Sequence, residues 1–227
     1  MSESTEVAQR LDRDLAVARG GYDEALVDWR REATMRFEKG HKAATRRHIV
    51  DVASKCVRRD GISAAGIAGI MGEAGLTKGA FSPHFESKEA LVREAIASAL
   101  GDQQHHLDED QRRGLDLEGA IRRYLNRAHL EDQAGGCPSA ALLPEIARQP
   151  LSTRQDYEKG LRSYVSTLAA LLPDADSAAS GRRATAIFGL MVGTLQFARA
   201  VPDAAQAEQI LEGGVEAALH LARAPSS

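Results

Sequence analysis

The sequence has little cysteine, few aromatic residues and no long apolar run. Its two cysteines, Cys56 and Cys137, offer no disulfide framework and suit a reducing compartment. Aromatic residues are 4% of the 227 residues, while alanine is abundant, which disfavours a β-sandwich and favours helices. No apolar run approaches the roughly 18 residues that span a bilayer, and the polar N-terminus lacks a signal-peptide core. We therefore expect an all-α, soluble, cytoplasmic protein without a membrane partner.

Motifs of catalysis are also missing. The chain has no glycine loop that would cradle a phosphate, no nucleophile elbow and no metal-ligand spacing, so we predict neither an enzyme nor a bound cofactor. His105 and His106 precede an acidic run, which could suggest a metal site. Adjacent helical residues point about 100° apart, however, and charged clusters are usually solvated, so we predict no metal.

Charge is unevenly distributed along the chain. Residues 1–34 carry 5 Lys and Arg against 8 Asp and Glu, residues 35–94 carry 11 against 7, and residues 95–227 carry 13 against 17. The segments are therefore −3, +4 and −4, for a net charge of −3. The positive middle segment favours attraction to phosphates, although an uneven solvated surface would give the same count.

The positive segment begins with a predicted basic helix over residues 43–59, which has Arg58 on its outer face and stops at Gly61. Two short helices joined by a tight turn are predicted after it. Gly75 tolerates the positive φ of such a turn, and Thr77 is a candidate N-cap for a second helix over about residues 78–84. A helix presented in this way fits the major groove of DNA, although an ordinary pair of packed helices would share these features. Apolar residues at helical spacing line one face of the first helix: Ile67, Ile70 and Met71.

Three motifs here resemble the N-terminal domain of tetracycline-repressor (TetR) family regulators. They read ATRRHIV from residue 44, EAGLTKGAF from residue 73 and HFESKEAL from residue 84. The resemblance implies an all-α homodimer that a small molecule releases from its operator. It also implies a helix-turn-helix domain over residues 41–96 and an effector-binding and dimerisation domain over residues 97–227.

Two positions depart from the family pattern. The family usually has a tyrosine directly after the position of Phe81, where its hydroxyl meets a phosphate, but this chain has Ser82. Pro83 follows, and a proline inside a helix removes one N–H and crowds the carbonyl four residues back. We therefore expect a recognition helix that is short and ends near His84, with altered affinity and operator preference.

The residues expected at DNA form two groups. Lysine can donate to guanine O6 or N7, and small residues allow close approach to bases, whereas the second group faces phosphates. His84 and Lys88 follow from the family resemblance, and Lys88 also lies at a helix N-terminus. Phe81 and Phe85 are expected to pack inward. The recognition group is Thr77, Lys78, Gly79, Ala80 and Ser82; the phosphate group is Thr45, Arg46, Ser63, His84 and Lys88.

The C-terminal half predicts several more helices. Ser87 caps one that runs through at least Leu100, with Gly101 as a weak point. The last two resemble the helices that family members pair into a four-helix dimer interface, which would require a near-palindromic operator. An internal core without a dimer is the alternative. The five helices predicted after the Ser87-capped helix cover residues 117–132, 138–148, 152–172, 180–200 and 204–222. The small or apolar residues of the last two include Gly189, Gly193, Ile210, Leu211, Gly214, Ala218 and Leu221.

The effector pocket is expected to combine apolar bulk with a few hydrogen-bonding groups. Any single candidate is more often plain core. Cys137 precedes a proline at a predicted helix N-terminus, where a thiol could sense oxidants or electrophiles. The candidates are Tyr124, His129, Leu142, Ile146, Tyr164, Leu168, Phe188, Met191 and Gln196.

Residues 1–40 precede the family match. Their apolar residues recur every three or four positions, which predicts an extension that is partly helical or disordered. Met35 is an alternative start, in which case residues 1–34 would have no biological role.

These observations favour a ligand-responsive transcriptional repressor that binds double-stranded DNA. One rival is a sensor or interaction protein with weakened operator recognition, which uses its N-terminal extension to dock a partner. An enzyme is the other rival. The effector, the operator and the regulated genes are not encoded in any motif that we recognise.

Overall fold

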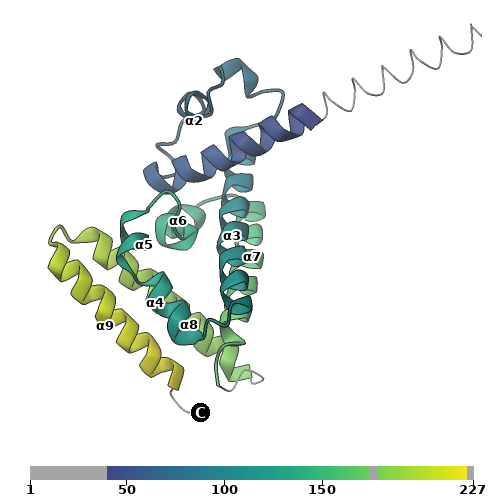
Figure 1. Ribbon diagram of the computed structural model, residues 1–227. Helices are drawn as coiled ribbons and strands as arrows, with labels where there is room; N and C mark the ends of the chain where they lie inside the picture. Colours follow the sequence, from purple (N-terminus) through teal and green to yellow (C-terminus); the bar gives the residue numbers. More distant parts are fainter. Residues whose placement is uncertain (1–39, 174–177, 224–227) are drawn as a thin grey trace, which may run out of the picture. The chain divides into compact units, whose positions relative to one another are not determined.

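The described part of the chain is built from helices. The structure is a computed structural model that describes residues 40–173 and 178–223, so the predicted N-terminal extension lies outside it. No strand occurs in these two ranges, which confirms the all-α prediction. The elements are a helix over residues 40–60, α2 (Ile67–Glu73), the single 3₁₀ turn η1 (Lys78–Ala80), α3 (Lys88–Arg112), α4 (Leu117–Tyr124), α5 (Arg127–Glu131), α6 (Pro138–Ile146), α7 (Leu151–Ala169), α8 (Ala178–Ala200) and α9 (Ala204–Arg223) (Figure 1).

Two glycines set the bends around α2. Gly61 follows the helix over residues 40–60 with φ +88°, and Gly75 follows α2 with φ +69°. Both values lie in the left-handed region, where a Cβ is strained, so glycine is the residue of least cost at each bend. The predicted stop at Gly61 and the predicted turn at Gly75 are confirmed.

The predicted recognition helix over residues 78–84 is wrong in its length and type. Only η1 is regular, and a turn follows it in which the N–H groups of His84 and Phe85 donate to the carbonyl of Phe81. Pro83 explains the early stop, because it has no N–H and its ring crowds the carbonyl of Gly79. Thr77 occupies the N-cap position, but its hydroxyl makes no capping hydrogen bond.

Helix α3 is the longest element, at 25 residues. Its predicted cap is confirmed, because the Ser87 hydroxyl accepts from the N–H of Ala90 at 3.1 Å. The helix passes through Gly101 without a break, although glycine is a poor helix former. Buried side chains on either side of this glycine, Leu100 and Leu107 among them, hold the helix in its core.

The predicted helix over residues 117–132 is wrong, since the structure has two helices there. Leu125 has φ −95° and ψ 73°, which ends α4, and Asn126 then caps α5 by accepting from the N–H of His129 at 2.8 Å. The Asn126 amide also donates to the carbonyl of Arg123 at 2.7 Å. The side chain of Asn126 thus offers the backbone an alternative to helical bonding, which no glycine or proline signals.

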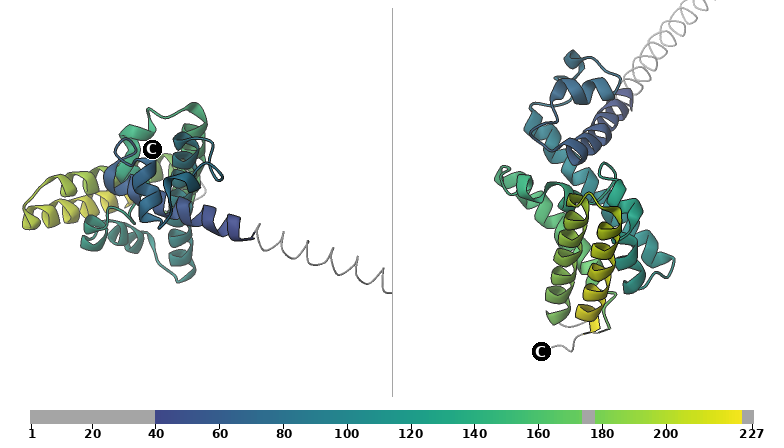
Figure 2. Two further views of the ribbon diagram at one scale, coloured as in Figure 1. Left: turned by 90° about the horizontal axis from the view of Figure 1, so that it is seen from above. Right: turned by 90° about the vertical axis from the view of Figure 1, so that its left-hand side faces the viewer.

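The remaining predicted helices are confirmed to within three residues at each end, as α6 to α9. Helices α8 and α9 lie side by side and antiparallel (Figure 2). Gly214 allows this approach, because a Cβ at its position would meet the side chain of Thr194, with Oγ1 at 2.6 Å. The close contact of Gly214 therefore joins α9 to α8 of the same chain.

Two buried apolar clusters organise residues 48–223. The first, called here the reader core, joins the helix over residues 40–60, α2 and the first half of α3. Leu142 and Ile146 of α6 belong to it as well. The second cluster joins the end of α3 to α4, α7, α8 and α9. Helix α6 therefore takes part in the core of the predicted DNA-binding segment.

Candidate DNA-binding surface and effector cavity

The turn over residues 78–85, called here the reader turn, presents small and polar side chains to solvent. Phe81 and Phe85 lie buried beneath it, with ring centroids 5.6 Å apart. The inward packing predicted for both phenylalanines is confirmed, and it anchors the turn on the reader core. Ala80 is half-buried, and the exposed residues of the predicted recognition group are Thr77, Lys78, Gly79 and Ser82.

The residues predicted to contact phosphates differ in exposure and in hydrogen bonding. Lys88 is half-buried, and its ammonium donates to the carbonyl of Ser63 at 3.4 Å. His84 is also half-buried. In the helix over residues 40–60, Arg46 is half-buried, and the Thr45 hydroxyl donates to the carbonyl of His41 at 3.0 Å. Contact of these residues with DNA stays a prediction.

Ser63 is engaged by α6. Its backbone N–H donates to Oε2 of Glu145 at 3.1 Å, and its hydroxyl lies 3.5 Å from the same oxygen. A carboxylate on these donors repels a phosphate. Contact between Ser63 and DNA is therefore a prediction that requires Glu145 to move away.

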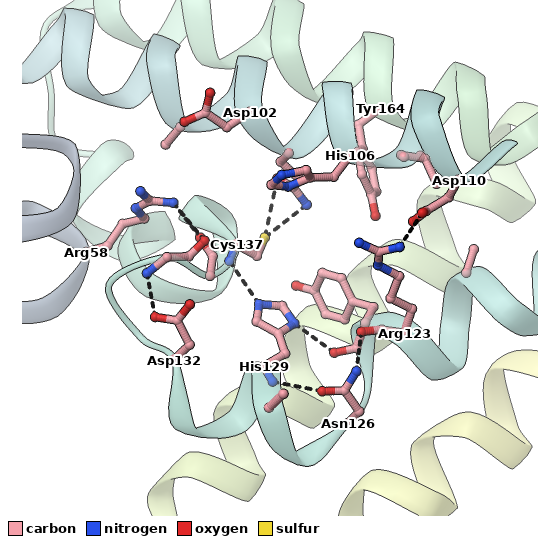
Figure 3. A pocket seen from close by; sticks show the side chains of 18 residues that line it. Arg58, Asp102, His106, Asp110, Arg123, Asn126, His129, Asp132, Cys137 and Tyr164 are labelled. Atoms are coloured by element: carbon pink, nitrogen blue, oxygen red, sulfur yellow. Dashed lines mark hydrogen bonds and ion pairs between the residues drawn. The ribbon is translucent and has the colours of Figure 1, made fainter. Parts of the chain in front are cut away.

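A cavity of about 320 Å³ lies among α3, α4, α5, α7 and the loop that precedes α6 (Figure 3). Its buried wall includes Leu107, Ala120 and Cys137, and its exposed side includes Asp102 and His106. The volume is near the lower end of the range for ligand sites, so the space suits a compact molecule.

Three of the nine predicted ligand residues line this cavity: Tyr124, His129 and Tyr164. The other six lie outside the lining of this cavity, so their contact with a ligand stays a prediction. Helical periodicity marks a side chain as buried without telling which core receives it. Leu142 and Ile146 are in the reader core; Leu168, Phe188 and Met191 are in the second cluster; and the Gln196 amide donates to the carbonyl of Ala140 at 2.9 Å.

His129 ties the loop before α6 to the end of α4. Its Nε2 accepts from the backbone N–H of Cys137 at 2.9 Å, so the ring proton belongs on Nδ1, which donates to the carbonyl of Tyr124 at 2.7 Å (Figure 3). Burial lowers the pKa of His129, because the charged imidazolium loses solvation. The neutral ring is thus a fixed part of the cavity wall.

Tyr124 is a buried tyrosine with an unused hydroxyl. Its ring packs edge-on against His129, with centroids 4.6 Å apart, and near Phe188 at 6.0 Å. The hydroxyl finds no hydrogen-bond partner among the described residues. Burial raises the pKa of this hydroxyl well above its usual value, so it is a neutral donor. An unsatisfied buried hydroxyl costs about 1–3 kcal/mol, which a bound molecule could recover.

Arg58 connects the predicted DNA-binding segment to the cavity. It is 7% exposed, and its Nη1 donates to the carbonyls of Gly135 and Gly136 at 3.2 and 2.8 Å (Figure 3). Its Nε donates to the carbonyl of Ser54 within its own helix at 3.0 Å. Loss of solvation lowers the pKa of this guanidinium. The loop before α6 is therefore bound to a residue that the sequence assigned to the outer face of a basic helix.

Two further carboxylates complete the polar lining. Asp110, only 5% exposed, forms an ion pair with Arg123. Asp132 accepts from the N–H of Gly135 at 2.7 Å. Both carboxylates therefore have partners before any ligand arrives.

The described residues contain no cluster of three or more His, Cys, Asp and Glu side chains that could hold a metal ion.

The segment that contains the reader turn and most of the reader core, called here the reader, carries a recognised family signature in its sequence. Residues 49–95 match the family model described as "Bacterial regulatory proteins, tetR family". The chain is similar to this family over these residues. This TetR match contains α2, the reader turn and the start of α3.

Solved structures support the same fold for the rest of the chain. The chain is similar to Escherichia coli NemR in its reduced form, with a TM-score of 0.66 and 18% identity over 81% of this chain and 100% of that one. TetR-family regulators from Agrobacterium tumefaciens and Cytophaga hutchinsonii give TM-scores of 0.65 at 20% and 17% identity, over 78% and 79% of this chain and 98% and 96% of theirs. No curated protein matches the sequence.

The sequence did not identify several of the residues that line the cavity. Arg58, Gln103 and Asp110 read as the polar faces of helices, because charged and amide side chains are usually solvated there. Only the pair Gly135 and Gly136 before Cys137 indicated a loop in the sequence, and a loop offers carbonyls to a buried donor.

Within the described ranges, no helix is both long and apolar enough to cross a bilayer.

Proposed function

We propose that the chain is a ligand-responsive repressor that binds a near-palindromic operator as a homodimer and releases it when a small molecule occupies the cavity. The observation that carries this proposal is the direct bonding between the cavity loop and the reader through Arg58. No catalytic step is needed for this function.

The reader turn supports contact with DNA. Lys78 is exposed next to Gly79, so its ammonium can reach a base edge while the small neighbour allows close approach. Ser82 is exposed in the same turn and can donate to a phosphate. Phe81 and Phe85 below it fix the turn in place, which reduces the entropy lost on binding.

The outer face of α8 supports a dimer. A Cβ at Gly189 or Gly193 would meet nothing within 4 Å, so this face is open in the single chain. Phe197 lies one turn further along and is 71% exposed, which is unusual for a phenylalanine. Small residues beside an exposed aromatic ring suit close packing against the same face of a second copy.

Helix α6 supports coupling between cavity and reader. Its N-cap residue, Cys137, lines the cavity, while Leu142 and Ile146 pack in the reader core. Glu145 also accepts from the N–H of Ser63, just before α2. A ligand that displaces the start of α6 must therefore disturb both the reader core and the position of α2, which gives the two states of an allosteric switch a physical basis.

A mobility-shift assay on DNA flanking the chain's own gene tests the proposal. We expect the full chain to bind a near-palindromic site at low salt, and Lys78→Ala to weaken binding at least tenfold while Lys159→Ala, which alters an exposed lysine on α7, leaves it unchanged. We expect Phe197→Glu to give a monomer in sedimentation analysis. Failure of the full chain to bind any such DNA would contradict the repressor function.

A second function has a specific observation in its favour. The recognition element is a single 3₁₀ turn, so it offers fewer residues to the groove than a full helix. A chain with weakened operator recognition would act as a sensor that docks a protein partner. A dimer that binds no DNA, together with partner binding that is lost when residues 1–34 are removed, would favour this alternative.

A further inference from the structure

We propose that Cys137 captures compact α,β-unsaturated carbonyl compounds covalently, so that the effector of this protein is an electrophile. The regulatory consequence rests on the proposed repressor function. The capture itself does not, because it can be measured without DNA.

The Cys137 thiol occupies a position where a modification would displace the start of α6. Cys137 is the N-cap residue of α6, is 3% exposed and lines the cavity. Its Sγ lies 3.3 Å from Nε2 and 3.6 Å from Oε1 of Gln103, and its own N–H is held by His129 (Figure 3). The cavity, whose outer side includes the exposed Asp102 and His106, offers a route from solvent to this sulfur.

The Tyr124 hydroxyl gives the second, independent indication of a ligand. It is buried, lines the same cavity as the thiol and forms no well-aligned hydrogen bond among the described residues, while the Cys137 sulfur lies close to it. A neutral hydroxyl in such a place can donate to an acceptor that enters the cavity. The carbonyl oxygen of a molecule that reacts at Cys137 would be such an acceptor.

Two arginines lie near the Cys137 thiol, of which Arg58 is buried and Arg199 is half-buried. Arg58 donates to the carbonyls of Gly135 and Gly136, and Arg199 donates to the carbonyls of His129 and Leu130 at 2.6 and 3.2 Å. Neither guanidinium forms an ion pair within the described ranges, although the carboxylate of Asp132 lies near both and that of Asp102 lies near Arg58. These hydrogen bonds fix the backbone on both sides of the thiol.

The addition balances without an oxidant or a further reactant. The Cys137 thiol gives its proton to cavity water, and the sulfur forms a bond to the β-carbon of the electrophile. The π electrons of the C=C bond move onto the carbonyl oxygen, where the Tyr124 hydroxyl donates to the enolate. A proton from water then reaches the α-carbon, so the net change is addition of S–H across the double bond.

The adduct would act on the reader through α6. Bulk at the N-cap residue of α6 would displace a helix whose Leu142 and Ile146 are buried in the reader core, at 0% and 2% exposed. Close-packed cores respond to such insertion by shifting rather than by compressing. Release of the Glu145 carboxylate from Ser63 and of the Gly135 and Gly136 carbonyls from Arg58 would follow.

The test uses N-ethylmaleimide on the native full chain, with the adduct mapped by mass spectrometry. We expect one adduct per chain, on Cys137. Cys56 provides the matched control, because it is buried outside the cavity and burial raises its pKa to about 11. Cys137→Ser should abolish the adduct, and Cys56→Ser should leave it unchanged. No adduct on the native chain, or equal reaction at both cysteines, would overturn the proposal.

A positioning role for Tyr124 separates capture in a built site from simple exposure of a thiol. Tyr124→Phe should slow reaction with N-ethylmaleimide about tenfold, while reaction with methyl methanethiosulfonate, which has no carbonyl to activate, keeps its rate. Equal slowing of both reagents would reduce Tyr124 to a structural residue and overturn its part in the proposal.

The effect of the Cys137 adduct on DNA binding distinguishes the electrophile proposal from the repressor proposal. If the unmodified chain binds DNA, we expect the adduct to weaken binding at least tenfold in the wild type and in Cys56→Ser, and to have no effect in Cys137→Ser. Adduct formation with unchanged DNA binding would overturn the electrophile as effector. If the chain binds no DNA at all, the repressor function fails while the mass-spectrometric result still decides whether Cys137 is a capture site.

Discussion

The exposed Lys78 and Ser82 of the reader turn contrast with the buried charged side chains of the cavity, since Arg58 binds backbone carbonyls and Asp110 pairs with Arg123. Exposed polar groups cost little stability and stay available for a partner, whereas buried ones must be satisfied within the fold. Substitutions on the reader should therefore change DNA affinity, and substitutions at the cavity should change stability as well.

The largest effect is expected at Arg58. Arg58→Met leaves the carbonyls of Gly135 and Gly136 without their buried donor, so we expect a loss of about 3 kcal/mol in the free energy of unfolding, measured by urea titration. Arg113→Met is the control, since Arg113 is 72% exposed and should change stability by less than about 0.5 kcal/mol. Equal effects of the two substitutions would remove the contrast between cavity and surface.

A second prediction concerns how tightly α8 and α9 are packed. Gly214→Ala places a methyl group against Thr194 and should cost about 2 kcal/mol. Gly101→Ala meets nothing within 4 Å inside α3, so better helix propensity should stabilise the chain by about 0.5–1 kcal/mol. Thermal unfolding of both variants measures the difference. A neutral Gly214→Ala would mean that the two helices separate at no cost.

On the reader, Lys88→Ala should weaken DNA binding about tenfold on every sequence and reduce the slope of affinity against salt by about one unit. Its unfolding free energy should hardly change, since its contact with the Ser63 carbonyl is long and exposed. Lys159→Ala is again the control for a lysine on α7. A loss confined to one operator base would contradict a phosphate role.

The smallest effect is a pH dependence at His129. Because burial lowers its pKa in the folded state, the unfolded chain binds the proton more readily. This histidine therefore favours folding fully above its unfolded pKa of 6.5 and progressively less as the pH falls below it. His129→Gln should flatten the fall in stability between about pH 7.5 and pH 5, whereas substitution of the exposed His220 should not. An unchanged slope would exclude His129 as its source.

The reader was the more predictable of the two regions. Gly61, Gly75 and the Ser87 cap are local signals, and each was read correctly because turn and cap chemistry depends on neighbouring residues alone. Pro83 was also recognised as a stop, but the sequence did not show that only one 3₁₀ turn would precede it.

The cavity was predicted only in part, because its residues meet through tertiary packing. Tyr124 and Tyr164 are distant in sequence, and Leu142 has the same helical pattern as true cavity residues while it lies in another core. Arg58 was out of reach for another reason. Its three acceptors are all backbone carbonyls, which carry no trace in the side-chain sequence.

The unbroken course of α3 through Gly101 has a mechanical consequence. Its 25 residues at 1.5 Å each form a rod of about 37 Å, with Lys88 at one end and the cavity residues Gln103 and Asp110 toward the other. A tilt of about 5° imposed at the cavity end displaces the opposite end by about 3 Å, which is comparable to the length of a hydrogen bond. A stiff lever of this kind would convert a small swelling of the cavity into a shift large enough to break the contact that we propose between Lys88 and a phosphate.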